Sequence, residues 1–185
     1  VKAECDICCT SSNAVQVVAS RAEDEIIFLP DQNLGSFVAA RFPDKIFHLW
    51  PGYCLTHHRV LPEHIRAARR KLPDAEVLVH PECRPEVVEL ADFVGSTAQI
   101  LARVDASPAP AFIVGTEMGV IPGLRRAHPD KEFYVPHPEL ICPTMKQIGL
   151  ETVVKSLKTM QTDVTVPEPI AGRARTALER MLEAG

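Results

Sequence analysis

Two cysteines in this sequence are the first residues to consider, because their positions could bring two thiols together. Cys54 and Cys142 each end a proline-containing loop that follows a short apolar segment. If these segments are parallel strands, both cysteines lie near carboxyl strand ends, where open parallel sheets bind their ligands. Two thiolates meeting there could hold a metal ion or an iron–sulfur cluster. The simpler alternative is that both are buried thiols without a metal, as free cysteines often are.

A His-Pro-Glu segment could supply acid–base chemistry at the same place. His80-Pro81-Glu82 directly follows the apolar stretch Val77–Val79 and should emerge at the same sheet edge as the cysteines. An imidazole and a carboxylate there can exchange protons or bind a substrate. The alternative is an ordinary loop pair near a helix start. The second His-Pro-Glu, at residues 137–139, is interpreted as structural.

Ser11 and Thr97 are hydroxyl residues that each precede a helix-like stretch. Residues of this type often cap helix amino ends. Their hydroxyls and the nearby amides could also hold an anionic substrate. The two interpretations are compatible.

The remaining cysteines give weaker evidence of a functional role than Cys54 and Cys142 do. Cys5, Cys8 and Cys9 form a Cys-x-x-Cys-Cys run, which can indicate redox chemistry or zinc. There is no second pair to complete a four-cysteine zinc site, so buried thiols in a short strand are the favoured interpretation. Cys83 is interpreted in the same way.

Two histidines follow Cys54 closely, in the order Cys54-x-x-His57-His58. This spacing could be half of a zinc site. A role for His57 in orienting a metal ligand from outside the coordination sphere is favoured.

The elements that must position these residues occur twice. Pro43-Asp44-Lys45 recurs 86 residues later as Pro129-Asp130-Lys131. Cys54 and Cys142 are 88 residues apart, so a two-residue insertion brings them into register. A repeated sequence register indicates repeated structural units. Other residues match at the spacing of 86: Asp6 with Asp92, Thr10-Ser11 with Ser96-Thr97, Asp31 with Glu117, and Phe47 with Phe133.

Short apolar strands alternate with helical stretches along the chain, which predicts an α/β fold with short parallel sheets and helices on their faces. Pro85 and Pro143 suit first helical turns. Strands are predicted at residues 25–29, 46–49, 77–79, 93–95, 111–114 and 132–135, and helices at 64–71, 85–90, 97–104 and 170–182.

Composition limits the class of protein. A net charge of −4 in 185 residues gives no basic face, so nucleic acid is not an expected partner. No apolar run approaches the roughly 20 residues that span a bilayer. Without a secretory signal the expected compartment is the cytoplasm, where six cysteines would be thiols or metal ligands rather than disulfides.

The chain resembles the quinolinate synthase family over almost its whole length. Any one matching segment is weak, but their order and separations together are specific. The segments are residues 6–14, 30–35, 50–54, 77–83, 94–97, 113–117 and 142–146.

The resemblance implies three αβα domains around a pseudo-threefold axis, two of which are present here. Residues 1–53 would be the second repeat, incomplete at its N-terminal end, and residues 54–141 the third. Residues 142–185 would form a helical segment that packs on a first domain upstream of this chain.

The resemblance also implies a [4Fe-4S] cluster held by one cysteine per domain. Two of these would be Cys54 and Cys142, and the third would belong to the first domain. The implied reaction condenses iminoaspartate with dihydroxyacetone phosphate to quinolinate in NAD biosynthesis, with the open iron as Lewis acid. His80 and Glu82 would be catalytic, and the substrate-binding residues would be Ser11, His80, Pro81, Glu82 and Thr97.

Three further expectations follow from the resemblance and from the alternatives to it. This chain alone should be inactive, and L-aspartate oxidase is a possible functional partner as the source of iminoaspartate. A non-catalytic iron–sulfur or zinc-binding sensor is the competing function. A structural αβα repeat with inert cysteines is the third possibility.

Overall fold

The computed structural model describes residues 1–184 and divides into two compact units. The larger unit, Ala22–Ile141, contains every strand that the structure describes. The smaller unit combines residues 1–21 with the chain from Cys142 onward. Among the described residues, no helix is both long enough and apolar enough to cross a membrane.

The larger unit contains two parallel sheets. In the four-stranded sheet the spatial order is β4-β3-β5-β6, and in the two-stranded sheet β1 pairs with β2. The strands are β1 (Glu25–Phe28), β2 (Ile46–Leu49), β3 (Glu76–Val79), β4 (Phe93–Val94), β5 (Ala111–Gly115) and β6 (Glu132–Tyr134).

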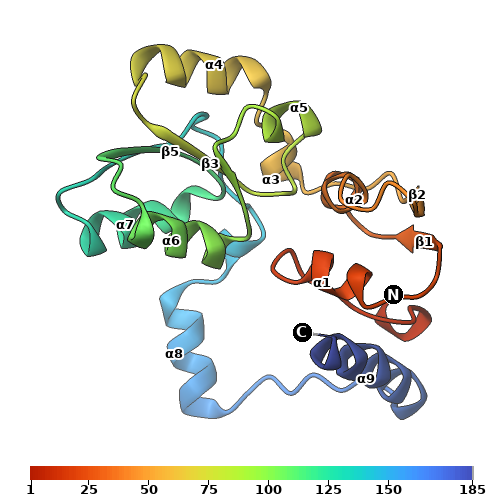
Figure 1. Ribbon diagram of the computed structural model, residues 1–185. Coiled ribbons are helices and arrows are strands. Elements are labelled where there is room, and N and C mark those ends of the chain that lie inside the picture. The colour runs from red at the N-terminus through yellow and green to blue at the C-terminus, as the bar shows by residue number, and fades with distance from the viewer. Residues whose placement is uncertain (185) are drawn as a thin grey trace. The chain divides into compact units, whose positions relative to one another are not determined.

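Helices cover both faces of the four-stranded sheet, so this part has three layers (Figure 1). One face carries α4 (Pro62–Lys71) and α5 (Pro85–Val88), and the other carries α6 (Thr97–Ala106) and α7 (Ile121–Ala127). The predicted α/β class with short parallel sheets is therefore confirmed.

Side chains that alternate along the central strands fill the two cores. On β3, Val77 and Val79 face the α4–α5 layer, whereas Leu78 faces the α6–α7 layer. On β5, Ile113 joins the first core and Phe112 the second. All five side chains have no solvent exposure. A strand that is apolar on both faces is expected in a parallel sheet covered on both sides.

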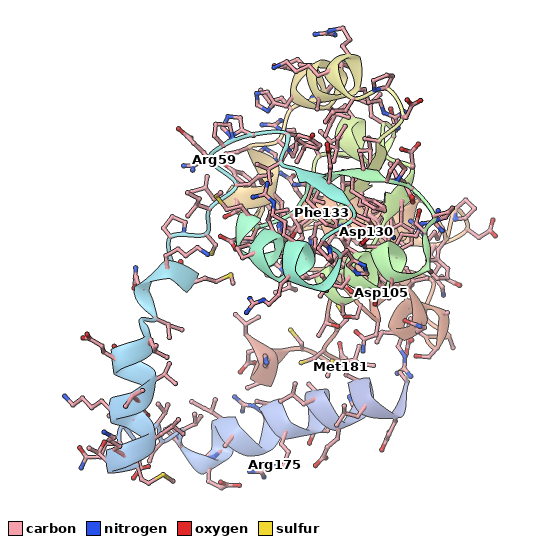
Figure 2. The ribbon with its side chains drawn as sticks, turned by 90° about the vertical axis from the view of Figure 1, so that its left-hand side faces the viewer. Arg59, Asp105, Asp130, Phe133, Arg175 and Met181 are labelled. Atoms are coloured by element: carbon pink, nitrogen blue, oxygen red, sulfur yellow. The ribbon has the colours of Figure 1, made fainter. Side chains whose placement is uncertain are left out.

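An aromatic pair links two strands of this sheet. Phe112 stacks on Phe133 of β6 with ring centroids 5.6 Å apart. Figure 2 shows Phe133 where β6 meets the core, with the exposed Asp105 and Asp130 at the surface.

Local sequence explains where the helices begin. Ser96 caps α6 and forms a capping box with Gln99, while Pro62 and Pro85 occupy first turns. Asp31 caps α2 (Gln32–Ala39). All predicted strands and helices are present, with boundaries that differ by two residues or fewer.

The two strand pairs share the spacing found in the sequence. Strand β5 begins 86 residues after β1, and β6 begins 86 residues after β2. The helix caps Asp31 and Glu117 are also 86 residues apart. Each strand pair therefore has an acidic cap shortly after its first strand.

The smaller unit is organised by its last helix, α9 (Glu168–Glu183). Ala177 of α9 is buried, and its carbonyl accepts a hydrogen bond from the Cys8 amide at 3.0 Å. Arg173 pairs with Glu4 at 2.7 Å. On the same helix Arg175 is exposed and Met181 half-buried (Figure 2). The predicted amphipathic C-terminal helix is confirmed.

Two expectations about the smaller unit need correction. Cys5, Cys8 and Cys9 lie in coil rather than in a short strand. Pro143 lies in a turn before a short 3-10 helix at Met145–Gln147, not in the first turn of an α-helix. The predicted helical segment 142–185 also contains the amphipathic helix α8 (Leu150–Thr159), for which no separate bounds were predicted.

Candidate metal and acid–base site

Side chains from three loops meet at the carboxyl ends of β3 and β5. His80 and Glu82 follow β3, and Thr116 follows β5. Cys54 and His57 come from the loop after β2 and from the short helix α3 (Leu55–His58) that follows it. One donor atom each of Cys54, His57 and Glu82 lies within 4.8 Å of the other two. The structure thus brings Cys54 together with the His-Pro-Glu segment.

His57 is held from three directions. Its Nδ1 lies 3.0 Å from Glu82 Oε2, and its Nε2 lies 3.0 Å from Thr116 Oγ1. Its ring stacks on His80, with centroids 4.1 Å apart and planes 8° from parallel. His57 is only 8% exposed, so water competes little for these contacts.

The charges of this group follow from its burial and its contacts. Burial lowers the pKa of His57, but hydrogen bonds and charges from Cys54 and Glu82 outweigh it and raise this pKa to about 9. Burial and the neighbouring His57 lower the pKa of His80 to about 4. Burial raises the pKa of Glu82, but its hydrogen bond to His57 and the nearby histidines lower it overall. At neutral pH, His57 is therefore cationic, Glu82 anionic and His80 neutral.

The loop after β3 fixes the tautomer of His80. The Glu82 amide donates to His80 Nδ1 at 3.2 Å, so the proton of the neutral ring lies on Nε2. The His80 amide donates to the Gly115 carbonyl at 3.1 Å, which continues the β3–β5 ladder. Cys83 has no exposure, and burial raises its pKa to about 12, as the prediction of a buried thiol requires.

The amino end of α2 positions both functional loops. Asp31 accepts hydrogen bonds from the Leu34 amide at 2.8 Å and from the Cys54 amide at 2.6 Å. Asn33 donates to the Glu82 carbonyl at 2.9 Å. Gly52 keeps the cysteine loop close, because a Cβ there would lie 2.4 Å from the Pro30 carbonyl oxygen. These contacts hold Cys54 and Glu82 at fixed positions relative to each other.

Thr97 and Ser11 do not act as helix caps. Ser96, not Thr97, caps α6, and Thr97 is the first residue of that helix. Asn13 precedes α1 (Ala14–Ala19) as its first flanking residue, and Ser11 lies in the turn before it. Thr97 follows β4 and so lies at the same sheet edge as His80, whereas Ser11 and Cys142 belong to the smaller unit.

The other histidines near these motifs have structural surroundings. His58 stacks on Tyr53 at 4.0 Å and lies 3.0 Å from Asn33 Nδ2. His137 packs against His64, with ring centroids 4.4 Å apart. The group of possible metal ligands is formed by Cys54, His57 and Glu82 and does not include the second His-Pro-Glu segment.

The Cys-x-x-Cys-Cys run lies in the smaller unit, where all three thiols are half-buried. Burial raises the pKa of Cys9 to about 11, and Cys8 and Cys5 contribute to this rise. A thiol with so high a pKa is a poor nucleophile at neutral pH.

Two residues of the site were not identified from the sequence. Thr116 lies in the matching segment 113–117, but a lone threonine after a strand does not by itself indicate a role. Asp31 lies in the matching segment 30–35 and is the repeat counterpart of Glu117, and this shared acidic position is the available signal.

The donor set suits a soft or borderline metal. Cys54 is free and half-buried at the end of its loop, and it supplies the thiolate donor that iron–sulfur clusters require. The hydrogen bond from the Cys54 amide to Asp31 fixes the backbone that carries this thiol and so orients it as a ligand. Cys54 therefore fits the role of one cluster ligand.

Comparison with known proteins identifies a family whose model matches this chain. The family model described as "Quinolinate synthetase A protein" matches residues 1–183. The chain is 51% identical over 183 residues to quinolinate synthase of Caldicellulosiruptor saccharolyticus, covering 99% of this chain and 60% of that protein. It is 54% identical over 182 residues to quinolinate synthase of Geobacter sp. strain M21, covering 98% and 60%.

A third relative gives the same result. Quinolinate synthase 1 of Methanosarcina acetivorans is 50% identical over 182 residues, which cover 98% of this chain and 60% of that protein. The chain thus spans about three fifths of the length of the curated relatives that it matches.

Proposed function

This chain belongs to the quinolinate synthetase A family, and from that premise we propose that it forms the greater part of a quinolinate synthase. The proposed reaction condenses iminoaspartate with dihydroxyacetone phosphate, releasing phosphate and water, in cytoplasmic NAD biosynthesis. The observation that supports the proposal is the group around His57, because donor atoms of Cys54, His57 and Glu82 lie within 4.8 Å of one another.

The proposed cofactor is a [4Fe-4S] cluster with Cys54 and Cys142 as two ligands. The third cysteine would come from residues upstream of Val1. The non-cysteine iron would supply a Lewis acid for the dehydration steps. Support for Cys54 comes from its thiol position and from the hydrogen bond that its backbone amide donates to the Asp31 carboxylate.

Glu82 and His80 are proposed to move protons. Glu82 is ionised at neutral pH and is 24% exposed at its side chain, so its carboxylate can accept a proton from a bound substrate. His80 is neutral and carries its proton on Nε2, which can donate a hydrogen bond. His57 would hold Glu82 in place through its Nδ1.

Substrate anions are proposed to bind Thr97, Ser11 and Pro81 together with the His80–Glu82 pair. Thr97 is half-buried at the start of α6, a ten-residue helix whose amino end favours negative charge. Pro81 is buried between the two ionisable residues and restricts the backbone that carries them. The substrates carry carboxylates and a phosphate, which such surroundings stabilise.

We further propose that the complete protein repeats this architecture three times around a pseudo-threefold axis. The shared spacing of 86 residues between the two strand pairs supports the proposal. Residues 7 and 8, the counterparts of strand β4, lie in coil here. The strand beside them would come from the residues upstream.

The C-terminal segment 142–185 is proposed to pack on that first domain. Helix α8 supports this, because its apolar residues are exposed; among them Leu150 is 79% and Leu157 71% exposed. Amphipathic helices usually bury such a face.

Quinolinate formation by the complete, anaerobically reconstituted protein tests the proposal. Glu82→Gln keeps the shape of the side chain but removes the base, so the turnover number should fall at least about 100-fold. The matched control is Glu139→Gln, on the exposed second His-Pro-Glu, which should leave turnover unchanged. Equal turnover in both variants would exclude Glu82 as a catalytic base. Residues 1–185 alone should form no quinolinate.

L-aspartate oxidase is the proposed functional partner, because iminoaspartate must be produced by oxidation of an amino acid close to its point of use. Quinolinate formation from aspartate in a coupled assay, with and without that oxidase, tests this partnership. A non-catalytic sensor would bind its metal but form no quinolinate under either condition.

A further inference from the structure

We propose that Cys54, His57 and Glu82 also form a mononuclear site for a divalent transition-metal ion such as Zn²⁺. This ligand set differs from that of the proposed cluster but overlaps it, because the two share Cys54. It does not rest on the proposed activity, because it uses only contacts within the larger unit.

The spacing of the three donors is close to that of a zinc site. One thiol, one imidazole nitrogen and one carboxylate oxygen lie within 4.8 Å of one another. Tetrahedral Zn²⁺ with bonds of 2.0–2.3 Å holds its ligands about 3.5 Å apart. Side-chain rotations that move the donor atoms by about 1 Å would therefore bring all three within bonding distance of a metal ion.

The two nitrogens of His57 have separate partners, which suits metal binding. Nδ1 faces Glu82, and Nε2 lies 3.0 Å from Thr116 Oγ1. With Nδ1 on the metal, the Nε2 proton would be donated to Thr116, whose side chain is 1% exposed. A hydrogen-bond partner on the second nitrogen is a regular feature of histidines that bind metals. The proton shared by Nδ1 and Glu82 leaves when the metal binds.

The surrounding structure holds the ligands and leaves an access route. Asp31 anchors the Cys54 amide, and Asn33 anchors the Glu82 carbonyl. Glu82 keeps 24% of its side chain exposed, so a hydrated ion can reach the group. Three protein ligands leave a fourth position for water, as in catalytic zinc sites.

The ligand types indicate which metals should bind. Thiolate, imidazole and carboxylate together favour Zn²⁺, Co²⁺ or Fe²⁺ over Mg²⁺ or Ca²⁺, which prefer oxygen ligands. Because Cys54 belongs to both sets, a bound Zn²⁺ ion and the cluster exclude each other. Zn²⁺ should therefore block cluster assembly on the protein.

Anaerobic titration of the cluster-free chain with Co²⁺ tests the site. Binding should give one ion per chain, with a thiolate-to-cobalt charge-transfer band and the strong visible bands of tetrahedral Co²⁺. Cys54→Ser should abolish the charge-transfer band, and His57→Asn should weaken binding at least about 100-fold. Thr116→Val should weaken it about 10- to 100-fold through loss of the partner on Nε2.

Two controls separate this site from other thiols. Cys5→Ser removes a thiol of the Cys-x-x-Cys-Cys run, and Cys142→Ser removes a proposed cluster ligand; both should leave the cobalt bands unchanged. Zinc-edge X-ray absorption on the loaded chain should show one sulfur among the ligands. Retention of the charge-transfer band in Cys54→Ser, or more than one sulfur on the zinc, would overturn the proposal.

The outcomes also distinguish this inference from the proposed function. In the complete protein, Cys142→Ser should lose the cluster and activity while it still binds Co²⁺. His57→Asn should lose Co²⁺ binding but retain Cys54 and Cys142 for cluster assembly. A protein that assembles its cluster and makes quinolinate, but binds no Co²⁺ when cluster-free, would refute the mononuclear site alone.

Discussion

Replacing Asp31 should weaken both the fold and the metal site, because its carboxylate joins two elements. One oxygen caps α2 through the Leu34 amide at 2.8 Å, and the other holds the Cys54 amide at 2.6 Å. The side chain is buried, with 6% exposure. Both amides would lose their partner in Asp31→Ala.

The magnitude follows from these two bonds. Loss of an N-cap costs about 1 kcal/mol, and a buried amide left without a partner costs about 1–3 kcal/mol. Asp31→Ala should therefore lower the free energy of unfolding by about 2–4 kcal/mol. Asp31→Asn retains one acceptor oxygen, so it should lose about half as much.

Urea unfolding of the chain, followed by circular dichroism, measures the loss. The matched control is Asp44→Asn at an exposed position, which should change stability by less than about 0.5 kcal/mol. Cobalt affinity in the same variants reports the position of Cys54, and Asp31→Ala should weaken it more than Asp44→Asn does. If Asp31→Ala were as stable as the control and bound Co²⁺ equally well, the positioning role of Asp31 would be wrong.

Three further predictions concern charge, thiol reactivity and packing. The folded pKa of His57, about 9, lies above its ordinary value of 6.5, so in the metal-free chain its interactions with Cys54 and Glu82 stabilise the fold fully below pH 6.5, and about 3 kcal/mol should be lost as pH rises through 9. Unfolding free energies on both sides of this window should change less in Glu82→Gln, and equal changes would contradict the pairing with Glu82. Cys83, with no exposure and a pKa of about 12, should resist alkylation in the folded chain while Cys5 reacts; mass spectrometry of the labelled peptides will show whether it does. Ile113→Ala should lower the free energy of unfolding by about 2–5 kcal/mol, because it leaves a cavity between β5 and the α4–α5 layer; a loss below about 1 kcal/mol in urea unfolding would argue against that core.

The strands of the larger unit could be predicted because their apolar residues favour a buried strand over other local structures. Val77, Leu78 and Val79 are apolar without interruption, which is expected of a parallel strand buried on both faces. The prolines and the Ser96 cap marked where helices begin. Local sequence was sufficient there because local preference and tertiary packing agree.

The prediction of a strand was wrong for the segment around Cys8. Ile7 and Cys8 have a strand-like sequence, yet they lie in coil, where the Cys8 amide donates to the Ala177 carbonyl at 3.0 Å. The bounds of α8 were not predicted within the helical segment 142–185, although its apolar residues Leu150, Val153, Val154 and Leu157 recur at helical spacing.

The candidate site was predicted in part. The position of His80 and Glu82 after a strand, together with the repeat, was enough to place them at the sheet edge with Cys54. The contacts of Thr116 and Asp31 could not be predicted from the sequence. Thr116 contacts His57, which is 59 positions away, and Asp31 contacts Cys54, which is 23 positions away, so only the folded chain brings them together. Long-range hydrogen bonds of single polar residues leave no periodic signal in a sequence.

Iron and sulfide content of the complete, anaerobically reconstituted protein tests most directly whether Cys54 is a metal ligand at this site. Cys54→Ser should lose the [4Fe-4S] cluster together with quinolinate formation, whereas Cys5→Ser should retain both. A Cys54→Ser protein with its full complement of iron and sulfide and undiminished turnover would contradict the account.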